Sequence, residues 1–153
     1  MRIARWLPVT AACLLAACAT APTNKSSAAD EALVTARVQE LLNKYEANDQ
    51  AGVTAMLDSQ LLILGSQINE KIRTPEQLQA LMARDFSQWG QARFTDVRDM
   101  DVRVGGDLAT AYFLISFRAG DNPSIPIRLT TTWRKRDNQW YLTQSANSVM
   151  VAR

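Results

Sequence analysis

Residues 99–108, DMDVRVGGDL, indicate most directly how this chain folds. Met100, Val102 and Val104 alternate with charged side chains, which predicts a strand with one buried and one solvated face. The glycine pair that follows allows the tight turn of a β-hairpin. An antiparallel sheet is therefore expected around this segment.

The hairpin pattern repeats toward the C-terminus. Further strands are expected over residues 108–118, 125–136 and 140–149. Turn-forming residues separate them at residues 120–123 (GDNP) and 137–138 (DN). The C-terminal half is therefore predicted to be a sheet of long strands joined by hairpins.

The chain before this sheet has helical periodicity. Apolar residues at three- and four-residue spacing predict an amphipathic helix that Asp30 caps and that continues past Tyr45. Asp49 is expected to cap a short second helix that runs through Leu57. Residues 61–64 (LLIL) then predict a buried strand, and residues 70–73 a short return strand.

A third helix is predicted from the clearest start signal in the sequence. Thr74 is suited to the N-cap, Pro75 to the first helical position, and Gln77 to closing a capping box. Gly90 is expected to end the helix. The sequence therefore predicts one α+β domain over residues 30–153, a cone in which three N-terminal helices pack on one face of a curved, mostly antiparallel sheet.

The N-terminus has the layout of a secretory signal. Arg2 and Arg5 precede an apolar stretch that is shorter than the roughly 20 residues a membrane-spanning helix needs. The stretch ends in Leu15-Ala16-Ala17-Cys18, which resembles the lipobox of bacterial lipoproteins. We expect a signal peptide over residues 1–17, lipid on Cys18, and a flexible tether over residues 18–29. The alternative is an ordinary secretory signal cut near residues 19–21.

This interpretation sets the expected location and excludes some partners. The lipid on Cys18 would anchor the chain in the cell envelope, and Ala19 after it favours the outer membrane, facing the periplasm. Removing the signal leaves 15 basic residues against 15 acidic ones, so a nucleic-acid partner is not expected. Cys18 would be the only cysteine left, which excludes a disulfide within the mature chain.

Two motifs resemble the nuclear transport factor two-like (NTF2-like) fold, and within it the SnoaL-like group. Glu70 followed by residues 74–76 (TPE) resembles that group's acidic residue before a helix start. Residues 128–133 (RLTTTW), a basic turn, and residues 140–142 (WYL) resemble its closing strands. The resemblance covers roughly residues 31–149 and implies a pocket between the helices and the sheet.

The chain departs from this group at an inward-facing histidine, which members often carry on the last strand. Ala146 is expected at that position, and the sequence contains no histidine. The commonest general acid or base near neutral pH is therefore missing. We predict no catalytic residue, no metal and no cofactor.

The expected pocket residues follow from the alternation of side chains along strands. Counting in twos from Trp140 places Gln144, Ala146 and Ser148 on the inner face of the last strand. Arg128 is a candidate anchor for an anion, or else a solvent-facing arginine. The candidate ligand-binding residues are Tyr45, Phe86, Trp89, Tyr112, Arg128, Trp140, Gln144 and Ser148.

Two functions are compatible with this pocket. The first is a non-catalytic module that binds a small apolar or anionic ligand or a protein partner. The second is an isomerase or hydrolase of the SnoaL-like kind acting on an apolar substrate. The position of Asp58, Glu70 and Asp85 discriminates between them, because an enzyme of this fold needs a carboxylate in the pocket close to Tyr45, Tyr112 or Arg128.

The resemblance also implies a homodimer. Proteins of this fold commonly pair through the sheet face that the helices leave uncovered. The residues expected on that face are Thr131, Trp133, Tyr141 and Thr143.

Overall fold

The computed structural model describes residues 28–150. The predicted signal peptide, Cys18 and most of the tether lie outside these residues. Within them, no helix is both long and apolar enough to cross a membrane.

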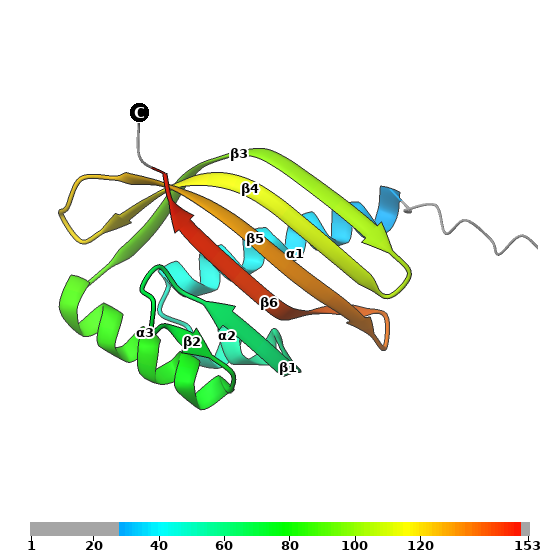
Figure 1. The fold of residues 1–153 in the computed structure, drawn as a ribbon, viewed down its shortest axis with the longest axis horizontal. Helices are drawn as coiled ribbons and strands as arrows, with labels where there is room; N and C mark the ends of the chain where they lie inside the picture. The colour runs from blue at the N-terminus through cyan, green and yellow to red at the C-terminus, as the bar shows by residue number, and fades with distance from the viewer. Residues whose placement is uncertain (1–27, 151–153) are drawn as a thin grey trace, which may run out of the picture.

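The described residues form one curved sheet with helices on one of its faces, which confirms the predicted α+β class (Figure 1). The strands run in the order β2-β1-β6-β5-β4-β3. Only β1 and β6 pair in parallel; the other neighbours are antiparallel. The strands are β1 (Leu57–Leu64), β2 (Lys71–Ile72), β3 (Ala92–Gly105), β4 (Leu108–Ala119), β5 (Ile125–Arg136) and β6 (Gln139–Val149).

Three helices precede the long strands, as predicted. They are α1 (Ala28–Glu46), α2 (Gln50–Ala55) and α3 (Pro75–Trp89). Helix α1 crosses the sheet behind β4, β5 and β6 in Figure 1 and buries Val34, Val38 and Leu42 against it. Thr74 caps α3 by accepting a hydrogen bond from the Gln77 N–H at 3.3 Å, and Gly90 ends the helix with φ 69°.

Two boundaries differ from the prediction. Asp30 lies within the first turn of α1 instead of capping it, and its carboxylate pairs with Lys135 at 2.7 Å. Helix α2 ends at Ala55, and Leu57 already begins β1. The prediction counted Leu57 as helical because an apolar run of this length fits a buried helix or a buried strand equally well.

Strand β3 bends twice, which curves the sheet around α1. Its pairing with β4 shifts between Thr95 and Arg98 and again between Arg98 and Asp101. Asp96 and Asp99 lie at these shifts with φ of 58° and 54°. Aspartate tolerates this left-handed conformation better than most residues, so the two bends are encoded locally.

Strand β6 carries a bulge that changes which side chains face inward. Its register with β5 shifts so that Leu142 pairs with Trp133 while Gln144 pairs with Thr132, which leaves Thr143 as the extra residue. One extra residue reverses the alternation of every side chain beyond it. Leu142 therefore faces the helices, and so do Ser145 and Asn147.

The core lies between the three helices and the sheet. Its largest fully buried side chains include Trp133, Trp140 and Phe113. The predicted placement of Thr131 and Trp133 on the uncovered face is wrong, because they are 1% and 0% exposed. Together with Ile127 and Leu129 they form the more apolar side of β5, and burial of that side is favoured over burial of its polar alternative. These six strands and this core lie within the described residues 28–150, so a chain of residues 19–153 keeps all of them.

Candidate functional site

A cavity of about 670 Å³ lies between α3, the end of α1 and the sheet. Its walls are mostly apolar, with aromatic rings at the end where α3 stops. Trp89 contacts Phe117 with ring centroids 5.5 Å apart, and Phe117 contacts Phe94 at 5.4 Å. Polar side chains interrupt this wall on α3, on β6 and on the loop between β1 and β2.

The first polar group joins α1 to α3. Tyr45 in the last turn of α1 donates its hydroxyl hydrogen to Asp85 Oδ2 at 3.2 Å. Asp85 is 4% exposed and shares the buried face of α3 with Leu78 and Met82. A carboxylate on an apolar helix face requires partners, and Tyr45 is one of them.

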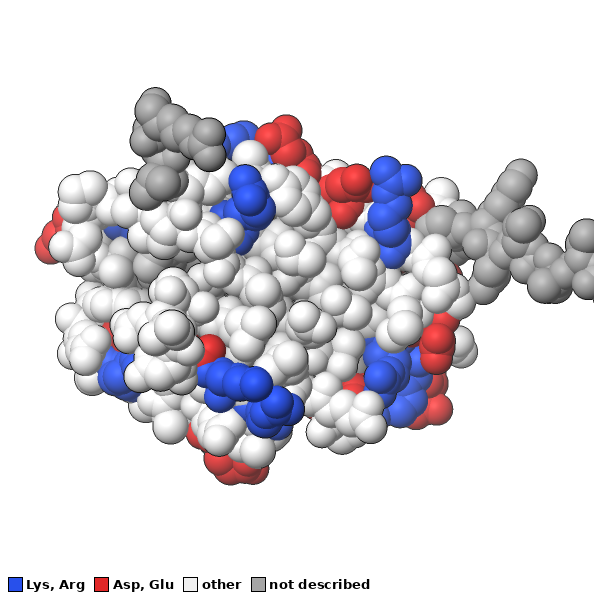
Figure 2. Space-filling view, in the orientation of Figure 1, with Lys and Arg blue, Asp and Glu red and all other residues white. Residues whose placement is uncertain are grey.

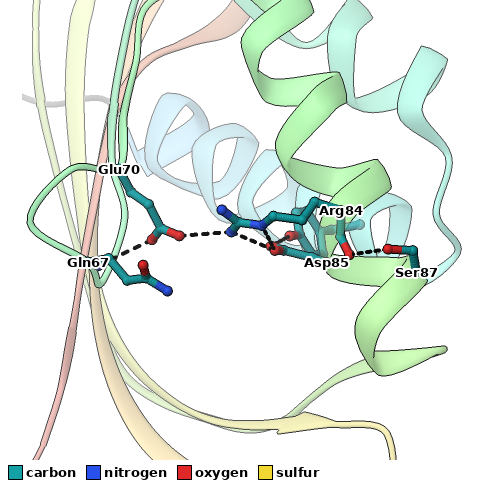
Figure 3. A network of polar contacts seen from close by, with 6 residues as sticks. Gln67, Glu70, Arg84, Asp85 and Ser87 are labelled. Carbon is teal, nitrogen blue, oxygen red and sulfur yellow. Dashed lines mark hydrogen bonds and ion pairs between the residues drawn. The ribbon is translucent and has the colours of Figure 1, made fainter.

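Arg84 supplies the other hydrogen bonds to Asp85 and connects the site to a loop. Its Nε and Nη2 donate to Asp85 Oδ1 at 3.1 and 2.8 Å. Nη2 also pairs with Glu70 Oε1 at 2.9 Å, and the Gln67 N–H donates to Glu70 Oε2 at 3.2 Å (Figure 3). The loop between β1 and β2 is thereby fastened to α3 at the edge of the cavity.

Tyr45 is held in its neutral form. Burial raises the pKa of its hydroxyl well above the ordinary value of 10.0, and the charge of Asp85 raises it further. The ring packs against Phe86 and Phe94, with centroid distances of 5.8 Å to each. Tyr45 therefore acts as a hydrogen-bond donor to Asp85, and its oxygen keeps a lone pair for another donor.

The structure brings only some of the predicted pocket residues together. Tyr45 and Trp89 line the cavity, and Phe86 contacts the ring of Tyr45. Trp140 is 2% exposed in the core beneath α1, where its carbonyl accepts a hydrogen bond from Arg37 Nε at 3.0 Å. Whether the lining residues bind a ligand stays a prediction.

The structure places the other four candidates outside the cavity: the inward placement of Tyr112, Gln144 and Ser148 is wrong, and for Arg128 the solvent-facing alternative is confirmed. On the uncovered face of the sheet, Arg128 of β5 lies opposite Ser148 of β6. Gln144 lies earlier along β6 on the same face, and the side chains of all three residues are exposed. Tyr112 is 36% exposed on the same face, between the buried Ala111 and Phe113. The bulge at Thr143 reverses the count along β6, and the more apolar alternate set of β5 turns Arg128 outward.

Sequence reasoning missed two polar residues of the cavity wall, Ser145 and Asn147. The buried Oδ1 atom of Asn147 has no hydrogen-bond partner among the described residues. No sequence signal marks the bulge that turns them inward. Asp85 did have a signal, because it follows Leu78 and Met82 at the seven- and three-residue spacing of one helix face.

Of the three carboxylates that discriminate between the functions, two line the cavity. Asp85 is within hydrogen-bond reach of Tyr45, and Glu70 joins it through Arg84. Asp58 lies elsewhere, buried at the start of β1, where its Oδ1 is 3.4 Å from Arg134 Nη1. In the described part of the chain, no group of three or more acidic, cysteine or histidine side chains is placed to hold a metal ion.

Solved structures with the same fold come from several bacteria. An NTF2-like protein of unknown function from Pseudomonas putida KT2440 matches with a TM-score of 0.73 and 19% identity over 82% of this chain and 90% of its own. A candidate dehydratase of the NTF2-like family from Streptomyces avermitilis gives 0.72 and 13% identity over 81% and 98%. A candidate ketosteroid isomerase from Parabacteroides distasonis gives 0.64 and 20% over 86% and 93%. The fold is therefore NTF2-like.

A model of the SnoaL-like domain matches residues 34–152. The chain belongs to this domain family, as its two motifs indicated. A search of curated proteins gave no match.

Proposed function

We propose that this domain binds an apolar small molecule in the cavity between α3 and the sheet. The observation that carries this proposal is the cavity itself. Its volume of about 670 Å³ falls among those of small-molecule sites, which are largely apolar with a few converging polar groups. Tyr45, Asp85 and Asn147 would orient the guest, while the aromatic end would bury its hydrocarbon part.

Binding of the neutral fluorophore N-phenyl-1-naphthylamine to residues 19–153 tests this proposal. We expect saturable one-to-one binding. Ser145→Leu, which adds volume inside the cavity, should weaken it about tenfold. Ala146→Leu adds comparable volume to the next residue, which lies on the other face of β6, and should leave the affinity unchanged. Equal losses in both variants, or no saturable binding, would contradict the proposal.

A second candidate function is proton transfer on the bound molecule. It is favoured by Asp85, a cavity carboxylate that contacts a tyrosine, which is the arrangement an isomerase or related enzyme of this fold needs. Against it, both oxygens of Asp85 already accept hydrogen bonds, Oδ1 from Arg84 and Oδ2 from Tyr45, so the carboxylate is engaged within the protein before a guest arrives. If the protein consumes a co-purified guest and Asp85→Asn abolishes this consumption, the domain is an enzyme. Binding of the guest without turnover favours the non-catalytic binding function.

We also propose that the mature chain is a lipoprotein of the outer membrane that faces the periplasm. The support is the meeting of an apolar run with small residues and Cys18. Mass spectrometry of the membrane fraction should find a diacylated chain that begins at Cys18, and Cys18→Ala should accumulate the precursor. A mature protein that begins at Ala19 or later and carries no lipid would refute this.

A further inference from the structure

The side chains of the cavity wall carry more negative than positive charge. Among the described residues three of them are charged, the carboxylates of Glu70 and Asp85 and the guanidinium of Arg84 between them. Both contacts run through Nη2 of Arg84, at 2.9 and 2.8 Å. One positive group is thus shared by two negative ones, and the wall has a surplus negative charge.

Arg84 is a poor anchor for an anion despite its charge. Its Nε and Nη2 are occupied by the two carboxylates, and the remaining nitrogen, Nη1, makes no hydrogen bond within residues 28–150. An anion that approached Nη1 would be attracted by one charge and repelled by two neighbouring ones. A guest carboxylate is therefore disfavoured at this wall.

The unused hydrogen-bonding atoms inside the cavity include two acceptors. Asn147 Oδ1, on β6 just beyond the bulge, is buried and has no hydrogen-bond partner in the described part of the chain. Tyr45 has given its only hydrogen to Asp85 and retains a lone pair on its oxygen. A buried acceptor without a partner is costly, so a guest that donates hydrogen bonds gains affinity by supplying one.

We infer that the cavity selects an apolar molecule with a primary amine head group, in its protonated form, over the carboxylate of the same skeleton. This inference rests on the proposed binding function, since it concerns the guest of that cavity. The ammonium group donates up to three hydrogen bonds and compensates the surplus charge of Glu70 and Asp85. The corresponding alcohol should bind with intermediate affinity, because it donates but carries no charge.

The test uses three compounds on one ring system, 2-naphthylmethylamine, 2-naphthylmethanol and 2-naphthoate. Each displaces N-phenyl-1-naphthylamine from residues 19–153 at pH 7, at low and at moderate salt. The amine should bind about tenfold more tightly than the carboxylate. Moderate salt should reduce this difference in affinity, because it screens the charges of the cavity wall.

Two variants test which residues of the cavity cause the preference for the amine. Glu70→Gln removes the surplus charge and should reduce the ratio of amine to carboxylate affinity about tenfold, whereas Glu76→Gln, an acid of α3 outside the cavity wall, should not. Asn147→Leu should weaken the amine and the alcohol several-fold and leave the fluorophore bound; Gln144→Leu on the outer face is its control.

The outcomes separate the two proposals. If the fluorophore binds but the carboxylate binds as tightly as the amine, the inference is overturned and the binding function stands. If neither the fluorophore nor any of the three compounds shows saturable binding, both are overturned.

Discussion

Asp85 is a buried carboxylate whose hydrogen bonds come from two helices. Tyr45 on α1 contacts one oxygen, and Arg84 on α3 contacts the other twice. Burial keeps Tyr45 protonated by raising the pKa of its hydroxyl, and the charge of Asp85 beside it adds to this effect. The two residues therefore stabilise each other only while Tyr45 is neutral.

This coupling predicts a loss of stability at alkaline pH. Above about pH 10, the unfolded chain releases the proton of Tyr45 while the folded chain keeps it, so the free energy of unfolding falls as the pH rises. The contribution is fully present below about pH 10, and the slope from this one group approaches about 1.4 kcal/mol per pH unit. Urea unfolding at pH 8, 10 and 11 should give a shallower decline for Tyr45→Phe than for the natural chain. Identical declines would contradict the prediction.

At the level of elements, the bulge in β6 determines which residues line the cavity. Hydrophobic periodicity predicted the long strands, and the Thr74-Pro75 signal predicted the start of α3, because these depend on local chemistry. The inner face of β6 could not be predicted this way, because its composition beyond Thr143 is polar on both sides. The side of β5 was predictable in principle, since Trp133 lies on the more apolar set, but the choice of Arg128 as a candidate anion anchor placed the opposite side inward.

The bulge can be tested with single cysteines, since residues 19–153 contain none. Ser148→Cys, on the exposed face, should react rapidly with a charged thiol reagent. Asn147→Cys should react at least about tenfold more slowly, because access to a partly buried site needs local opening. A ligand bound in the cavity should slow the labelling of Asn147→Cys and leave the labelling of Ser148→Cys unchanged. Faster labelling at position 147 than at 148 would mean that β6 has no bulge.

The bends in β3 make a second prediction at this scale. Asp99 has φ 54°, a conformation that glycine adopts freely and a β-branched residue resists. Asp99→Val should therefore be less stable than Asp99→Gly by about 1 to 2 kcal/mol in thermal unfolding. Asp101 is not among the residues of positive φ. There the valine variant should be more stable than the glycine variant, because valine has a higher propensity for strands than glycine. The same order at both positions would contradict the role given to Asp99.

At the scale of the whole molecule, one face of the sheet is left uncovered by the described helices. Figure 2 shows mainly uncharged side chains across its centre, with charged groups toward its margins. Tyr112 and Leu64 are 36% and 37% exposed there, and register places Thr130 and Ala146 between them. Tyr141 also belongs to this side, whereas Thr131 and Trp133 are buried. The homodimer expected from the sequence would therefore pair through the residues that do lie on this face, which include Leu64, Tyr112, Thr130, Tyr141 and Ala146.

We predict that residues 19–153 form a two-fold dimer at micromolar concentration through this face. Tyr112→Glu should raise the dissociation constant about tenfold or more, since it places a charge at the centre of an apolar interface. Ile68→Glu is the matched control, because Ile68 is a fully exposed apolar residue of the loop before β2. Sedimentation velocity distinguishes the forms, and a natural chain that stays monomeric would disprove the dimer.

The position of β6 also has a consequence for the order in which the chain folds. Among the described strands β6 comes last along the chain, yet it lies in the interior of the sheet, between β5 and the parallel β1. Its register joins Leu57 to Leu142 and Leu64 to Ala146, contacts that span most of the chain. Contacts so distant in sequence form slowly, and none of these can form before β6 has been synthesised. Until then the edges of β1 and β5 that β6 later joins have no strand to pair with, so they are open to pairing with other chains.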